Sequence, residues 1–483
     1  MSLTHKTFSG LKWTFLDTFF LKGSMFFFTI MLARIIGPAE FGLIGILTVF
    51  ISIGNALVEG GLSISLIRTL NSDNEDYSTV FFTNLVVSGL IYFTFFFSAP
   101  YISLFFNQPH LTNLIRVFCL SFILSAFSSV QIAILIKKLN FKKLTIFNLP
   151  GTIIALIFSL YLVFNGFGAW SVIAMYLTSQ FINIVLMWIY SEWKPTFLFS
   201  NEKFRLHFFY GYKLMLATVL DTLFKNIYNI IIGKFYSIQS LGYFDRAQSL
   251  NEYPITVIVG IINKVSYPIL SEMQNDKVKI AESYKKLMKI TFFITTPLIF
   301  SAIIIAEPLF LLVLGEEWII ASKFFQILCF ASVFYPIHAF NIIVLKVYGR
   351  TDLYLKIEVI KKIIIVLSII ALFKFGIYGL IWSSFITSIL ALIINTKYSS
   401  TLINYSFKEQ LSDMFPVIFV SSVMALIMYF TLNNLEECNL LVQIIIPMVL
   451  GYVFYFCYNL IIKNQYLKSY LVSYFCENKT YPF

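Results

Sequence analysis

Long apolar runs separated by short polar stretches dominate the pattern of this chain. Six runs begin near residues 13, 43, 79, 113, 145 and 168, and eight more begin near residues 209, 249, 288, 322, 354, 377, 411 and 440. Each run is about 18 to 27 residues long, which is enough to cross a bilayer as a helix. The pattern therefore predicts an all-α polytopic membrane protein with about fourteen transmembrane helices.

One of these runs, residues 216–234, carries a stripe of polar residues at helical spacing. The stripe consists of Thr218, Asp221, Thr222, Lys225 and Asn229. Asp221 and Lys225 lie four residues apart with the acid first, the order that best favours pairing on one helix face. Because each charge alone is costly in hydrocarbon, the stripe predicts either a packing ion pair or a polar path through the protein.

The same motif occurs near the start of the chain. Asp17 and Lys22 lie in the first apolar run, in a Leu-Asp-Thr context that also precedes Lys225. The second run adds a polar face that consists of Ser52, Asn55, Glu59 and Ser63. These repeated motifs indicate that the chain consists of two related halves.

Two further pairs of stretches support an internal repeat. Gly42 to Gly60 has the same spacing as Gly242 to Gly260. The pattern of glycines beside an aromatic residue at residues 166–170 recurs at residues 375–379. Each half has an even number of spans, so the halves are expected to be parallel repeats with a binding cleft between them. The expected divisions are an N-terminal six-helix bundle at 1–190, a cytoplasmic linker at 191–207, a C-terminal six-helix bundle at 208–396, and two additional helices with a tail at 397–483.

Composition and charge exclude a soluble protein and set the expected orientation. Hydrophobic residues make up 59% of the chain, charged residues 12%, and most of the 35 Lys and Arg residues fall in the termini and the even-numbered loops. Short cytoplasmic loops hold an excess of basic residues, so both termini are expected in the cytoplasm. The net charge of +11 then reflects topology, and no nucleic-acid partner is expected. The lysines at 137, 138, 142 and 143 are expected to lie against the anionic leaflet.

The chemistry-bearing residues form no enzyme constellation. The five cysteines are scattered, which predicts neither a disulfide framework nor a metal site. The chain contains no phosphate-binding glycine loop and no nucleophile elbow. His207 falls near the end of a span and His338 within one, where a lone histidine usually serves packing or hydrogen bonding. A non-enzymatic transporter without a cofactor is expected.

Several stretches resemble a known family. They are residues 32–43 with Gly60-Gly61-Leu62, residues 241–248 and 265–271, and residues 306–309, 314–318 and 349–352. Together they resemble the polysaccharide transporter family, the Wzx-like lipid-linked oligosaccharide flippases of the multidrug, oligosaccharidyl-lipid and polysaccharide exporter superfamily.

This resemblance implies a fold and a function. The fold would be two six-helix bundles that face each other in a V, followed by two trailing helices. The function would be to flip undecaprenyl-diphosphate-linked oligosaccharides across the bacterial cytoplasmic (inner) membrane, for O-antigen, capsule or exopolysaccharide. Membrane lipid, a coupling ion (proton or sodium) and polysaccharide assembly proteins are the other candidate partners.

The polar residues in the spans then acquire candidate roles. The candidates for binding the diphosphate and sugars are Lys22, Lys225, Lys264, Arg246 and Asn229. The candidates for ion coupling are Asp17, Glu59 and Asp221. The competing interpretation is that Asp17 with Lys22, and Asp221 with Lys225, only neutralise each other.

Two other functions stay open. A drug or cation antiporter of the same superfamily would favour a cavity dominated by carboxylates, whereas this chain places at least as many lysines in its spans. A membrane glycosyl polymerase would need a long extracytoplasmic loop with paired arginines, and the expected topology lacks such a loop.

Overall fold

The structure is a computed structural model that describes residues 23–462 except residues 60, 70–71 and 274–275. Asp17 and Lys22 lie outside the described residues. By its contacts the chain divides into two compact units, Met1–Asp245 and Arg246–Phe483. The four divisions expected from the internal repeat were drawn from sequence similarity, whereas these two units are drawn from contacts. The four divisions therefore stay a prediction.

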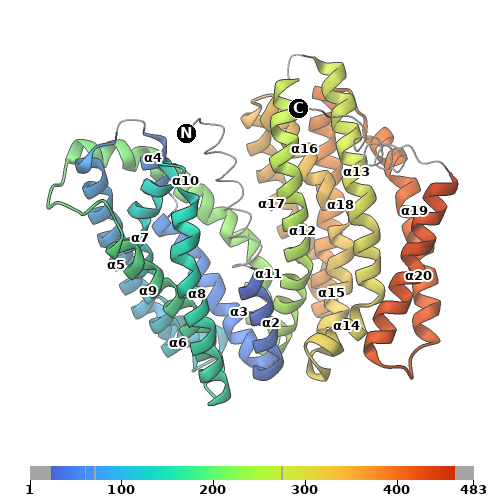
Figure 1. Ribbon diagram of the computed structural model, residues 1–483, viewed down its shortest axis with the longest axis horizontal. Helices are drawn as coiled ribbons and strands as arrows, with labels where there is room; N and C mark the ends of the chain where they lie inside the picture. Colours follow the sequence, from blue (N-terminus) through green and yellow to red (C-terminus); the bar gives the residue numbers. More distant parts are fainter. Residues whose placement is uncertain (1–22, 60, 70–71, 274–275, 463–483) are drawn as a thin grey trace, which may run out of the picture. The chain divides into compact units, whose positions relative to one another are not determined.

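The first unit is a bundle of helices (Figure 1). Its helices are α2 (Gly23–Ile36), α3 (Pro38–Glu59), α4 (Leu62–Arg68), α5 (Asn74–Phe106), α6 (Leu111–Phe118), α7 (Leu120–Lys137), α8 (Phe141–Phe164), α9 (Ala169–Ile189), α10 (Asn201–Lys225), α11 (Ile227–Phe235) and the start of α12 (Ile238–Glu272). Helix α8 packs along α9 and α5 packs along α7. Helix α10 begins at Asn201, within the stretch expected as the linker, and packs against α3, α4 and α5.

The second unit holds the rest of α12 and the helices that follow it. These are α13 (Lys277–Ile304), α14 (Ala306–Val313), α15 (Ile319–Ser332), α16 (Tyr335–Val347), α17 (Thr351–Leu372), α18 (Gly376–Ile403), α19 (Phe407–Asn433) and α20 (Leu440–Ile461). Helices α19 and α20 pack against each other, and α19 also packs along α13. The expected additional helices are thus part of the core of this unit, where Met424, Met428 and Tyr455 are buried against Ile305.

The described residues contain ten helical stretches that are long and apolar enough to cross a membrane, and the bent pair α10 and α11 makes an eleventh. One of the ten, Asp352–Ile403, joins α17 and α18 through the short 3-10 turn η3 (Phe373–Phe375). Helix α2 is a shorter apolar helix. The all-helical membrane architecture is therefore confirmed, and the count of about fourteen spans stays a prediction.

Local sequence explains the first turn of the described chain. Helix α2 ends at Ile36, Gly37 follows with a φ of 83°, and α3 begins at Pro38. Glycine adopts a positive φ without steric cost, and proline is favoured at the first position of a helix because its fixed φ suits it. The Gly-Pro pair thus ends one helix and starts the next.

The two glycines that the sequence paired meet each other in the first unit. A Cβ at Gly42 would overlap the carbonyl oxygen of Ile238, and a Cβ at Gly242 would overlap the carbonyl oxygen of Pro38. The starts of α3 and α12 therefore cross in direct backbone contact, which only glycine permits. The contact is reciprocal, as in an interface between two related elements.

The interior of the second unit contains polar groups that bond to one another. Tyr284 donates to Asn341 Oδ1 at 2.6 Å, and Ser399 donates to the same oxygen at 2.7 Å. His338 lies within hydrogen-bonding distance of Ser388, at 3.1 Å between Nε2 and Oγ, and of Asn395. These contacts hold α13, α16 and α18 together, the bonding role expected for a lone histidine in a span.

Candidate functional site

A polar cavity of about 450 Å³ lies inside the first unit. Helices α3, α4, α7 and α10 line it. Its polar lining residues are Ser52, Asn55, Ser63, Ser125, Ser128, Ser129, Thr218 and Thr222. The structure thus brings together two stripes that the sequence indicated separately, one on α3 and one on α10.

Three serines of α7 form one wall of this cavity. Ser125, Ser128 and Ser129 follow helical spacing and are all buried. The Gln180 amide donates to Ser125 Oγ at 2.7 Å, and the Asn84 amide donates to Ser129 Oγ at 2.9 Å. Amides from α9 and α5 therefore fix the serine wall from behind. The sequence analysis missed these serines, although their spacing of three and four residues was visible.

The facing wall offers polar atoms that are not yet bonded. Asn55 Oδ1 and Ser63 Oγ are buried and make no hydrogen bond within the described part of the chain. An unsatisfied buried polar atom costs about 1–3 kcal/mol. A ligand that supplies hydrogen bonds to these two atoms would recover that free energy.

Thr218 and Thr222 contribute hydroxyl groups from α10. Each hydroxyl donates to the carbonyl one turn earlier, at 2.9 Å to Leu214 and 2.8 Å to Thr218. Their oxygens keep lone pairs that can accept hydrogen bonds from a ligand. The cavity therefore combines donors and acceptors, and none of its described lining residues is charged.

The polar stripe of α10 does not continue straight through residue 229. The axes of α10 and α11 differ by 47°, and the break falls at Asn226. The Asn226 side chain donates to the Thr222 carbonyl at 2.8 Å, a local bond that competes with the helix. Asn229 is buried in α11, beyond the bend, and is not among the residues that line the cavity.

Asp221 and Lys225 form the ion pair that their spacing predicts. Lys225 Nζ lies 2.9 Å from Asp221 Oδ2. The Lys225 side chain is 75% exposed and the Asp221 side chain 44%. They lie on the last turns of α10, next to Thr218 and Thr222 in the sequence. Their roles in substrate binding and ion coupling stay predictions.

The other predicted site residues are placed only in part. No side chain is described for Asp17, Lys22, Glu59 and Lys264. Glu59 lies at the end of α3 and Lys264 in α12. Arg246 is buried in α12, and its guanidinium donates to Ser249 Oγ at 3.4 Å.

A buried polar cluster that the sequence did not reveal joins α10 to the other helices of the first unit. His207 Nε2 lies 3.1 Å from Asp76 Oδ1, and His207 Nδ1 lies 2.8 Å from Ser65 Oγ. Lys203 Nζ lies 3.1 Å from the other oxygen of Asp76. The side chains of His207 and Asp76 are almost fully buried, so the cluster fixes the start of α10 against α4 and α5.

The apolar helices define a multi-pass membrane protein, and its first unit holds a cavity with polar lining residues. A family model described as "Polysaccharide biosynthesis protein" matches residues 31–323, so the chain belongs to this family. The match confirms the resemblance to the polysaccharide transporters of the exporter superfamily that the sequence stretches carried.

Individual relatives agree with this assignment. The chain is 22% identical to the succinoglycan biosynthesis transport protein ExoT of Rhizobium meliloti (strain 1021) over 475 residues, which cover 96% of this chain and 94% of the relative. It is 24% identical to the lipopolysaccharide biosynthesis protein WzxC of Escherichia coli (strain K12) over 378 residues, which cover 77% and 76%.

A solved structure supports the fold. The lipid II flippase MurJ in an inward closed conformation matches with a TM-score of 0.70 and 17% identity, over 91% of this chain and 98% of that chain. At this identity the match shows that the two chains share a fold.

Proposed function

We propose that this protein is a flippase that moves undecaprenyl-diphosphate-linked oligosaccharides across the bacterial cytoplasmic membrane by ion-coupled alternating access. The uncharged polar cavity in the first unit carries the proposal, together with the family. Polar side chains at membrane depth are costly unless they face a cavity or a partner. The hydroxyl groups of a glycan match the hydroxyl and amide groups that line this cavity.

The nature of the lining favours a glycan over a drug cation. An organic cation would be held by carboxylates, and the described lining residues are serines, threonines, an asparagine and small or aliphatic residues. The relatives named for transport and polysaccharide biosynthesis also disfavour a glycosyl polymerase.

The charged residues complete the proposal. The lysines at 22, 225 and 264 would meet the diphosphate as point charges, and Arg246 would stand near the outer mouth. Asp17, Glu59 or Asp221 would exchange the coupling proton or sodium ion. Both termini and the linker at 191–207 would lie in the cytoplasm. Reporter fusions after residue 200 test this topology, because an active periplasmic reporter at that position would contradict it.

The cavity can be tested with two substitutions that spare the charged residues. Asn55→Leu removes the unbonded amide oxygen at nearly constant volume, and we expect transport to slow about two- to tenfold, the value of one lost hydrogen bond. Ser128→Leu places a larger apolar side chain in the cavity and should slow transport more than Asn55→Leu does. The measurement is the amount of undecaprenyl-linked oligosaccharide on the cytoplasmic side, normalised to protein in the membrane.

A matched control is available in the same unit. Thr94 lies on α5, is exposed, and donates only to its own helix, at 2.8 Å to the Leu90 carbonyl. Thr94→Leu should leave transport unchanged. Normal transport by both cavity variants at normal abundance would exclude a substrate role for the cavity.

The Asp221 and Lys225 pair needs a double substitution. If Lys225 only neutralises Asp221, Lys225→Ala lowers the abundance of folded protein, and Asp221→Asn with Lys225→Ala restores abundance and transport together. If Lys225 binds the diphosphate, the double variant folds and does not transport. Full transport by the double variant leaves Lys225 a structural partner.

A further inference from the structure

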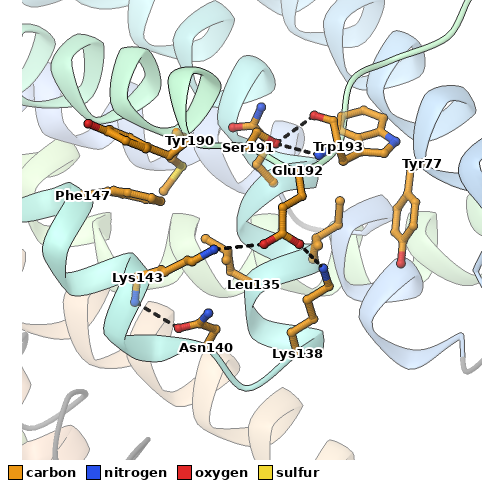
Figure 2. A pocket seen from close by; sticks show the side chains of 13 residues that line it. Tyr77, Leu135, Lys138, Asn140, Lys143, Phe147, Tyr190, Ser191, Glu192 and Trp193 are labelled. Atoms are coloured by element: carbon orange, nitrogen blue, oxygen red, sulfur yellow. Dashed lines mark hydrogen bonds and ion pairs between the residues drawn. The ribbon is translucent and has the colours of Figure 1, made fainter.

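A second cavity, of about 240 Å³, lies in the first unit where α7 and α9 end and α8 begins. Figure 2 shows its side chains. The turn between α7 and α8 and the segment 190–193 after α9 form its walls. It is distinct from the hydroxyl-lined cavity, because the two share no lining residue, although α7 contributes to both.

Two lysines converge on one carboxylate in this cavity. Lys138 Nζ lies 2.8 Å from one oxygen of Glu192, and Lys143 Nζ lies 3.1 Å from the other (Figure 2). The two ammonium groups lower the pKa of Glu192 to about 2. An anion with two or more oxygens, such as a phosphate ester, would meet the same pair of donors in the place of the carboxylate.

Gln131 gives the cavity an unused hydrogen-bonding group. Its side chain lines the cavity and is 4% exposed, and neither its Nε2 nor its Oε1 has a hydrogen-bond partner within the described residues. A buried amide without partners is costly. A ligand that carries hydroxyl groups beside its phosphate would both donate to and accept from this amide.

Aromatic side chains supply the remaining wall and are held in place. The rings of Phe147 and Tyr190 are stacked, with centroids 5.9 Å apart and planes 14° apart (Figure 2). Trp193 donates to Asn74 Oδ1 at 2.6 Å. This preformed apolar surface would accommodate the carbon skeleton of a ligand next to its phosphate.

The surroundings indicate that the ligand comes from the membrane. Helices α7, α8 and α9 belong to stretches long and apolar enough to span a bilayer, and the cavity lies at their ends. Beside it, Ile146, Leu149 and Ile153 of α8 are almost half exposed, which suits a surface that faces acyl chains. Basic pockets between membrane helices on the cytoplasmic side are known as sites for anionic lipid headgroups.

We propose that this cavity binds the headgroup of an anionic phospholipid with a hydroxylated headgroup, such as phosphatidylglycerol. The phosphate displaces Glu192 from Lys138 and Lys143, the headgroup hydroxyls bond to Gln131, and the glycerol carbons lie against Phe147. Glu192 keeps the two lysines paired when the lipid is absent. Of the four lysines that the sequence assigned to the leaflet, Lys137 is used elsewhere, because it donates to Ser72 Oγ at 2.9 Å.

Binding of phosphatidylglycerol to the purified full chain tests the proposal. The probe is phosphatidylglycerol titrated into protein in phosphatidylcholine nanodiscs, with bound lipid counted by native mass spectrometry. Each lysine near an anionic headgroup contributes about fivefold, so Lys138→Ala with Lys143→Ala should weaken binding about twenty-fivefold. Glu192→Gln should strengthen it by up to about fivefold, because the phosphate no longer competes with a carboxylate.

A control pair separates local binding from net charge. Lys279 and Lys323 also pair with single carboxylates, at 3.3 and 3.0 Å, and lie in the second unit. Lys279→Ala with Lys323→Ala removes the same charge and should leave binding unchanged. An equal loss in both double variants would overturn the proposal.

Three other outcomes also decide the proposal. Equal binding by the wild type and the Lys138 and Lys143 double variant overturns it. If that variant does not fold, the Glu192→Gln variant decides, since binding no tighter than that of the wild type contradicts the competition. Binding of soluble glycerol phosphate as tight as that of the lipid would show that the site takes phosphate esters from solution and not from the membrane.

Discussion

The crossing of α3 and α12 makes a sharp prediction, because the obstructing atoms belong to the backbone. A Cβ at Gly42 would fall on the Ile238 carbonyl, and no side chain can rotate away to make room. A carbon and a carbonyl oxygen need about 3.3 Å between them, so Gly42→Ala must push the two helices apart by about 1 Å. We expect this substitution to destabilise the first unit.

The size of the effect follows from a comparison with Gly89. Gly89 lies in the interior of α5, and a Cβ there would meet nothing within 4 Å. Both substitutions gain about 1 kcal/mol of helix propensity. Their difference therefore isolates the steric term, about 1–3 kcal/mol for overpacking, and the rigid obstruction at Gly42 favours the upper end.

Thermal unfolding of the two variants in the same detergent measures this difference. Cys119 is a free thiol buried in the first unit, so a thiol-reactive dye reports its exposure in a background in which the other four cysteines are replaced by serine. A difference of about 3 kcal/mol corresponds to about 6–12 °C for a unit of this size. If Gly42→Ala and Gly89→Ala unfold at the same temperature, the backbone contact does not exist as described.

The reciprocity of the contact gives an internal check. Gly242→Ala should cost about as much as Gly42→Ala, because its Cβ would meet the Pro38 carbonyl. Once one alanine has separated the helices, the second adds little, so the double variant should be clearly less destabilised than the sum. Strict additivity would mean that the two glycines act at independent sites.

Three further predictions concern polar contacts of the first unit. His207→Ala should leave one oxygen of the buried Asp76 carboxylate without its hydrogen bond, while Lys203 still pairs with the other, and should cost about 1–3 kcal/mol. The measurement is faster hydrogen exchange at the start of α10, and His110→Ala at an exposed site should have no effect. Glu40→Gln should weaken the start of α9 by about 1 kcal/mol in thermal unfolding, because Glu40 accepts from the Ala169 amide at 2.9 Å and the charge favours a helix N-terminus. Glu192 has a lowered pKa, about 2, so its pairing is complete above its usual value of 4.5 and is lost only as the pH falls towards 2. Its infrared carboxylate band, identified with Glu192→Gln, should stay constant down to about pH 3, and titration near 4.5 would contradict the pairing.

The sequence predicted those parts of the fold that depend on local rules. The apolar runs gave the membrane helices, and the Gly-Pro pair at residues 37 and 38 gave the turn between α2 and α3. The spacing of four residues gave the pairing of Asp221 with Lys225. Each of these follows from helix geometry or backbone sterics within one short stretch.

Other features depend on contacts that no local rule contains. The break at Asn226 interrupts an apolar pattern that runs on without proline, and only the side-chain bond to Thr222 marks it. The contact between His207 and Asp76 joins residues 131 positions apart. Such a contact requires the tertiary arrangement of α5 and α10, which the periodicity of either helix leaves open.

At the candidate site, too, the sequence predicted the local charged pair but not the residues that the tertiary structure brings together. Charge led the sequence analysis to Asp221 and Lys225, whereas the cavity is lined by uncharged residues such as Asn55, Ser63 and Ser128. In an apolar chain a charge must find a partner, so a charged pair is as consistent with packing as with function. A buried hydroxyl or amide that stays unbonded, as in Asn55 and Ser63, has no such structural explanation. Unsatisfied uncharged groups therefore indicate the binding surface of this protein better than the charged pair on α10 does.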